Sequence, residues 1–394
     1  MGGGELREDA GQEMTPTSPP TAARSLGGAQ PLLVLLAALG VVAFLYGTTQ
    51  GYPLQTWSIY LINLLFWSSL AVTGPAIAGM IQVTEGRWSP TIKRLALTTA
   101  GFLPVSFVLF VVLFAGRAVL YPWVNEPLPA KAVWLNVPFM SVRIGVGVLL
   151  LYWVAMRYTK AIFAADRAGV EVEVGNDRLM RLSSILLMLY VVVLSLWSFD
   201  LIMSLDPIWY SGLLGGYYVV SSMYTGFGLV TYLTLRYNED GVTAVSPKAI
   251  QDITKLTFAL SIVWMYFFFS QYLIIWYGNV PNETRFFVRG FLARPWGHLA
   301  WAIFIVGWLI PFGYLLKRLT GRPPTRHRVL KVILWMGWIA IFFERVLVVS
   351  VSLKQTAIPH GIIEVLVTLG FFALFVLSRN WFLARYQPVL TLPK

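Results

Sequence analysis

The chain has 394 residues, of which 57% are hydrophobic and only 12% charged, and its mean hydropathy is +0.68. Soluble domains carry about 25% charged residues, so this composition argues against a soluble protein and indicates a polytopic membrane protein. The net charge of +12 then fits basic loops that face anionic lipid, and not a nucleic-acid surface. The absence of cysteine excludes disulfides, cysteine-ligated iron–sulfur clusters and covalent c-type haem.

Residues 1–30 are polar and rich in Gly, Pro, Ser and Thr, with four acidic residues and two arginines. This composition predicts a disordered tail and not a signal peptide, whose first region is basic. Ten apolar segments follow, and most approach or exceed the ~20 residues that a helix needs to cross ~30 Å of hydrocarbon. They cover residues 31–47, 54–81, 92–116, 134–156, 179–203, 212–235, 253–278, 296–316, 329–353 and 361–378.

Lysine and arginine are distributed unevenly between the loops. With the N-terminus inside, the inner segments hold 22 of the 30 basic residues and the outer loops hold 6. Basic residues favour the cytoplasmic side, so the tail 1–30 and the tail 381–394 are both predicted to be cytoplasmic. We expect an all-α transmembrane domain over 31–380, in which spans 2–5 and 6–9 form two four-helix bundles and the outermost spans are peripheral.

One segment, LWSFDLIMSLDPIWYSGLLGGYY (residues 196–218), leads from the outer end of the fifth span into the sixth. Pro207 disfavours helix at Asp206, so we predict that the helix ends there. Asp200 lies six residues deeper, about 9 Å at 1.5 Å per residue. An unpaired carboxylate at that depth exchanges protons near neutral pH, and we interpret Asp200 as a proton acceptor and Asp206 mainly as a helix-end residue.

Aromatic side chains surround these two aspartates. Quinol oxidation releases two protons, so a quinol site needs a base beside a flat apolar slot. Asp200 is the candidate base, and the candidates for the slot are Trp197, Tyr210 and Tyr217. The alternative is the interfacial aromatic belt that is common in membrane proteins.

A second segment, FFFSQYLIIWYGNVPNET (residues 267–284), ends the seventh span. Gln271 and Tyr272 offer hydrogen bonds in the outer half and are further candidates for quinone binding. His298, at the outer edge of the eighth span, is another, with a surface or capping role as the alternative. The loop between these spans carries basic residues that suit lipid headgroups or an acidic extrinsic subunit: Arg285, Arg289 and Arg294.

Further charges fall within the outer half of the predicted spans. Arg143 and Glu344 lie at one depth, about 13–14 Å by helical rise, and we predict that they pair, either structurally or as a proton relay. Arg345 projects about 100° away from Glu344 and is expected to have another partner. His360 and Glu364 are spaced i,i+4 and either pass a proton or satisfy each other. The candidates for proton transfer are therefore Asp200, Asp206, Glu344, Arg143, His360 and Glu364.

The two motifs also support a family resemblance. SFDLIMSLDPIWYS (198–211) and FFFSQYLIIWYGNVPNET resemble segments of the NrfD-like proteins, the polysulfide reductase membrane subunit family. With ten spans and about 400 residues, the chain resembles over 31–380 the smaller of the two NrfD-like subunits of bacterial alternative complex III. The resemblance implies a multi-pass subunit, in the bacterial cytoplasmic membrane, of an oxidoreductase that passes electrons from quinol to cytochrome c or a blue copper protein.

The resemblance further implies that quinol, such as menaquinol, is the substrate, and that this chain contributes quinone access or proton transfer. The implied partners are a second NrfD-like subunit, an iron–sulfur subunit, multihaem and monohaem cytochrome c subunits, small membrane subunits and lipids. Haem c and iron–sulfur clusters belong to those partners. For this chain we expect no metal, haem or flavin, because it lacks cysteine, opposed mid-span histidines and a nucleotide fingerprint.

Two other classes of function remain open from the sequence. A secondary transporter or proton channel needs polar groups in both membrane halves and often has broken helices near the midplane, whereas the inner halves here offer mostly Ser and Thr. A purely structural membrane subunit would bind no quinone when purified.

Overall fold

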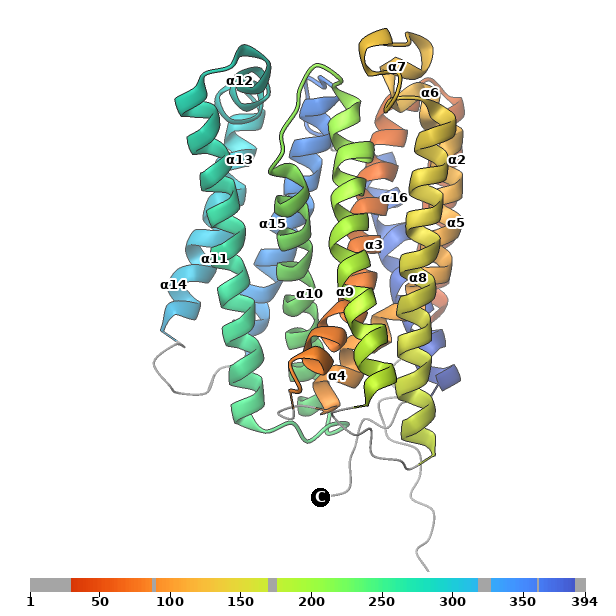
Figure 1. The fold of residues 1–394 in the computed structure, drawn as a ribbon, viewed down its shortest axis with the longest axis vertical. Coiled ribbons are helices and arrows are strands. Elements are labelled where there is room, and N and C mark those ends of the chain that lie inside the picture. Colours follow the sequence, from red (N-terminus) through yellow and green to blue (C-terminus); the bar gives the residue numbers. More distant parts are fainter. Residues whose placement is uncertain (1–29, 87–89, 169–175, 318–326, 360, 387–394) are drawn as a thin grey trace, which may run out of the picture.

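The computed structural model describes residues 30–386 apart from 87–89, 169–175, 318–326 and 360. All regular elements in these residues are helical, and nine helical segments among them are long and apolar enough to cross a membrane. They run side by side along the long axis of the molecule (Figure 1), as a multi-pass membrane protein requires. The segments are α2 (Gln30–Thr49), α3 (Pro53–Val83), α4 to α6 (Pro90–Leu120), α8 (Val137–Arg167), α9 to η5 (Asp177–Leu205), α11 (Pro247–Gly278), α13 to α14 (Trp296–Leu316), α15 (His327–Ser352) and α16 (Ile362–Tyr386).

The remaining predicted span, 212–235, forms a helix that is less apolar than the other nine. Helix α10 (Leu214–Glu239) has 26 residues, as many as α15, but its glycines, serines, threonines and tyrosines lower its hydropathy. It packs against α3, α9, α11 and α15, and most of its side chains are buried. Protein therefore surrounds most of α10, which explains how a helix with this composition lies within a bundle of apolar helices.

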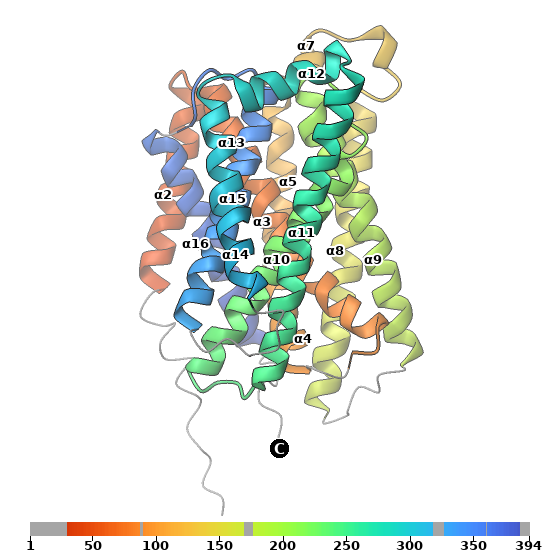
Figure 2. The ribbon, with the colours of Figure 1, turned by 90° about the vertical axis from the view of Figure 1, so that its left-hand side faces the viewer.

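The helices form the predicted two four-helix bundles. Helices α3, α4 to α6, α8 and α9 make the first bundle, and α10, α11, α13 to α14 and α15 make the second. Helix α3 packs on both α9 and α10, and 89% of its most apolar stretch is buried. The first and last spans, α2 and α16, pack against each other at the edge of the bundles, as Figure 2 shows.

Glycine allows the close packing of α2 against α16. A Cβ atom added at Gly40 would lie 2.6 Å from the Cα atom of Gly370. No side chain fits between backbones that approach this closely, which is the usual reason for small residues at helix interfaces in membranes.

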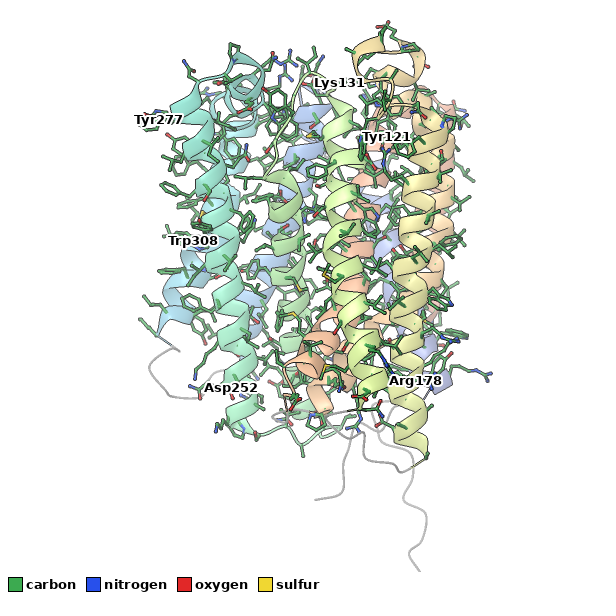
Figure 3. All side chains as sticks on the ribbon, in the orientation of Figure 1. Tyr121, Lys131, Arg178, Asp252, Tyr277 and Trp308 are labelled. Atoms are coloured by element: carbon green, nitrogen blue, oxygen red, sulfur yellow. The ribbon has the colours of Figure 1, made fainter. Side chains whose placement is uncertain are left out.

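The two ends of the bundle differ in their loops. One end bears α7 (Pro122–Asn125) and α12 (Pro281–Phe287), and we call it the α12 end; the other bears α4 (Pro90–Leu97), and we call it the α4 end. Figure 3 shows Lys131 at the α12 end, and Arg178 and Asp252 at the α4 end. Arg178 and Asp252 belong to two of the segments that sequence analysis predicts to be cytoplasmic, and both lie at the α4 end.

This arrangement makes a direct test of orientation possible. Because the sequence lacks cysteine, one introduced cysteine provides the single reactive thiol of the chain. Glu126 and Ala244 are exposed positions at the α12 and α4 ends, respectively. In intact cells we expect a membrane-impermeant thiol reagent to label Glu126→Cys but to label Ala244→Cys only after lysis. Labelling in the reverse order would contradict the orientation that the basic residues predict.

Candidate functional site

A small apolar cavity lies near the α12 end, between α10, α11, α15 and the segment formed by α12 and η6 (Val288–Leu292). Its volume is about 70 Å³. One ordered water needs about 10–15 Å³ of such space, so the cavity has room for several waters. Aromatic and aliphatic side chains dominate its walls, with four polar residues among them. The residues that matter for its chemistry are Trp209, Ser211, Tyr217, Gln271, Phe286 and Glu344.

The two sequence motifs meet at this cavity. Pro207 ends the preceding helix, so the chain turns back and places Trp209 and Ser211 on the cavity wall. The Trp209 ring stacks on Phe286, with ring centroids 3.9 Å apart and planes 15° apart. The Ser211 hydroxyl donates a hydrogen bond of 2.7 Å to Oε1 of Gln271. One contact is aromatic and the other polar, and together they fix the segment after Pro207 against α11 and α12.

The charged residue of the cavity is Glu344, which is only 2% exposed. Its Oε2 accepts a hydrogen bond of 2.5 Å from Nη1 of Arg345. The Arg345 guanidinium also donates to the Ser221 hydroxyl at 2.6 Å, and its Cζ lies 4.1 Å from the centre of the Tyr218 ring. These contacts engage Nη1 and Nη2 of Arg345, whereas its buried Nε has no hydrogen-bond partner among the described residues.

The other carboxylate oxygen of Glu344 is buried. Buried polar atoms without a partner are rare and costly. Tyr217 interacts with Glu344 by a side-chain hydrogen bond, and both residues line the cavity. A ligand hydroxyl in the cavity would supply a further donor, and a carboxylate in that position can accept the proton that a reacting hydroxyl loses.

The predicted pairing of Arg143 with Glu344 is wrong, and so is the expectation that Arg345 pairs elsewhere. Arg143 binds Asp200 through two hydrogen bonds of 2.7 Å, from Nε and Nη2 to the two carboxylate oxygens. Helix α8 packs on α9 within the first bundle, whereas α15 belongs to the second, so equal depth does not bring Arg143 to Glu344. The long Arg345 side chain reaches the residue beside it in spite of their angular separation.

Asp200 is therefore not an unpaired carboxylate. It lies in η4, a π-helical turn (Ser198–Ile202), and is 1% exposed. Its Oδ1 also accepts a hydrogen bond of 3.1 Å from Nε1 of Trp134, and the Arg143 guanidinium lies 3.8 Å from the Trp134 ring. All of these partners come from α8 or the loop before it. Asp200 does not line the cavity, so the candidate base and the candidate slot are separate features.

Asp206 ends the helix, as Pro207 predicts. The short 3₁₀ turn η5 (Met203–Leu205) stops before it, and Asp206 itself has an extended backbone. The carboxylate is 1% exposed and accepts hydrogen bonds of 3.0 and 2.9 Å from Nη2 of Arg285. Arg289 adds a second cation at 3.9 Å. Asp206 thus fixes the segment after Pro207 to α12, so part of the basic cluster has an internal partner.

The remaining candidates lie away from the cavity. Trp197 is fully buried against Phe110 in the first bundle. Tyr210 is exposed, Tyr272 is at the exposed surface of α11 beside Phe287, and His298 is exposed on α13. Glu364 lines a surface groove between α2 and α16. His360 lies outside the described residues.

Of the predicted candidates, the cavity brings together Tyr217, Gln271 and Glu344. Sequence analysis missed Ser211 and Phe286 as members of the site. Ser211 is the last residue of the first motif, and Phe286 follows the second motif by two positions. Proximity to the motifs is therefore the one sequence feature that could have identified them as site residues.

A flat apolar wall, a hydrogen-bonding group on α11 and a buried carboxylate suit the binding and deprotonation of an aromatic diol. A match to a known family would give a precedent for this chemistry. No protein-family model matches the sequence, and no curated protein matches it.

Proposed function

We propose that this chain is a membrane subunit of a quinol:electron acceptor oxidoreductase and that the cavity at the α12 end receives the quinol ring. The observation that carries the proposal is the buried carboxylate of Glu344, which lines an aromatic cavity at the junction of the two motifs. In this role Glu344 accepts a quinol proton, and Gln271 and Tyr217 hold the ring by hydrogen bonds.

The proposal places the ring of a quinol in the cavity, which must widen from about 70 Å³ to hold it, and leaves the isoprenoid tail outside. Oxidation of a quinol removes two electrons and two protons, so the site needs a proton acceptor at the ring and an electron acceptor nearby. Glu344 meets the first need. For the second, we propose haem c or an iron–sulfur cluster of a partner subunit, because the chain has no cysteine to hold either group. The tail would leave between α11 and η6, where Phe268, Phe287 and Phe291 are half-buried.

The motif resemblance supports a place for the chain in an alternative complex III of the bacterial cytoplasmic membrane. Its partners there would be a second NrfD-like subunit, an iron–sulfur subunit, cytochrome c subunits and small membrane subunits, and its electrons would reach cytochrome c or a blue copper protein. A purely structural subunit is the alternative, and it predicts that the purified protein binds no quinone.

The proposal is tested first by purification from native membranes, with identification of the co-purifying subunits and extraction of quinone. We expect multihaem and iron–sulfur subunits and a bound quinone. In that complex, Gln271→Leu is expected to raise the KM for quinol about tenfold, the effect of losing one hydrogen bond of about 1.4 kcal/mol.

Tyr272→Phe is the matched control, because Tyr272 is the next residue on α11 and does not line the cavity. Its KM should equal that of the unmodified complex. A complex that lacks redox subunits and quinone, or an unchanged KM in Gln271→Leu, would leave the chain with a structural role only.

A further inference from the structure

A second, larger cavity lies towards the α4 end, between α3, α10, α15 and α16. Its volume is about 530 Å³. Most of its lining is aromatic or aliphatic, and its charged residues are Arg236 and Asp240 at the end of α10 and Arg379 on α16. The aromatic walls include Trp67, Trp335, Trp338, Phe342, Phe372 and Phe375.

The polar end of this cavity contains an unsatisfied amide. Asn380 is 8% exposed and lines the cavity, and both its Oδ1 and its Nδ2 are buried without a hydrogen-bond partner. A buried amide with two free atoms indicates that a group outside the protein completes its hydrogen bonds. The neighbouring Arg379 is also 8% exposed, and Thr98 and Tyr237 hold its guanidinium at 3.0 and 3.1 Å. An oriented cation therefore lies beside the free amide.

The length of the cavity matches one leaflet of a bilayer. Its lining on α16 extends from Thr368 to Asn380, which is about 18 Å at 1.5 Å per residue. The hydrocarbon core of a bilayer is ~30 Å thick, so one leaflet spans about 15 Å. A molecule that fills the cavity thus has a polar head at the α4 end and an apolar chain that reaches the bilayer midplane.

We propose that this cavity binds an anionic phospholipid, with one acyl chain along the aromatic walls and the phosphate beside Arg236, Arg379 and Asn380. Arg236 is the second cation of the polar end, and the acid there is Asp240, 3.6 Å from Arg236. Two guanidinium groups and one carboxylate leave one net positive charge for the phosphate. A quinone head is uncharged and would leave that charge uncompensated. The proposal uses different helices from the quinol site and does not depend on it.

Native mass spectrometry of the full-length protein in detergent tests this site. We expect one phospholipid to remain bound after delipidation. After complete removal, phosphatidylglycerol should rebind more tightly than phosphatidylcholine of the same chain length. The double variant Arg379→Gln with Asn380→Leu is expected to weaken phosphatidylglycerol binding by roughly tenfold or more, because it removes a charge-assisted and a neutral hydrogen bond.

Two further variants separate lipid loss from misfolding. Ile339→Trp with Leu369→Trp fills the apolar slot from partly exposed positions and should abolish retention of the lipid while leaving the polar end intact. Arg385→Gln removes the same charge from an exposed position on α16 and should leave binding unchanged. Equal affinity for the two lipids, unchanged binding in both double variants, or a bound quinone in place of phospholipid would overturn the proposal.

Discussion

Replacement of Arg143 by glutamine is expected to lower the free energy of unfolding by about 3–5 kcal/mol, because it leaves a buried carboxylate without its cation. The side chains of Arg143 and Asp200 are 9% and 0% exposed, and two hydrogen bonds of 2.7 Å join them. Among the described residues, Trp134 would remain as a donor to Asp200, and a neutral donor does not replace a guanidinium.

The double variant Arg143→Gln with Asp200→Asn should regain much of that loss, since no buried charge is left uncompensated. The measurement is unfolding of the protein in mixed micelles for both single variants and the double variant, analysed as a double-mutant cycle. Arg294→Gln, at an exposed position of the α12 end, is the control for loss of a positive charge. Additive effects in the cycle would show that the two residues do not stabilise each other.

The depth of a residue can be predicted from the sequence, but its direction around the helix axis cannot be predicted as reliably. The hydropathy pattern and Pro207 correctly predicted the spans and the helix end at Asp206. Arg143 and Glu344 share a predicted depth, yet α8 packs on α9 and supplies Arg143 to Asp200. Pairing between helices depends on which helices are neighbours, and one sequence contains little information on that.

The candidate site was predictable only in parts. Tyr217, Gln271 and Glu344 were recognised one by one because each is a polar residue in the outer half of a span. Their convergence depends on the packing of α10, α11 and α15. The expectation that Asp200 is unpaired is wrong because its cation, Arg143, was assigned to Glu344, and the hydropathy pattern does not specify that α8 packs on α9. The helix end at Asp206 follows from a local rule, the effect of Pro207. The partner of Asp200 depends on contacts between distant segments, which the sequence does not reveal.

Glutamine at position 344 is expected to have two effects, one on stability and one on catalysis. It leaves Arg345, which is 2% exposed, as a buried cation with hydroxyl partners only, and removal of one member of a buried ion pair costs about 3–5 kcal/mol. It also removes the proposed proton acceptor, and a positioned base contributes about 10²–10⁴-fold to a rate. The single variant cannot separate these effects, because impaired assembly also lowers turnover.

The double variant Glu344→Gln with Arg345→Gln separates them. With no buried charge left, assembly should recover to near the level of the unmodified complex, and amounts of purified complex measure that recovery. If Glu344 is the acceptor, quinol oxidation stays at least about 100-fold reduced, and the acid limb of its pH–rate profile, which reports protonation of the base, disappears. A merely structural ion pair predicts the opposite result: recovered assembly would bring recovered turnover with the acid limb intact, and Glu344 would then have no part in the chemistry.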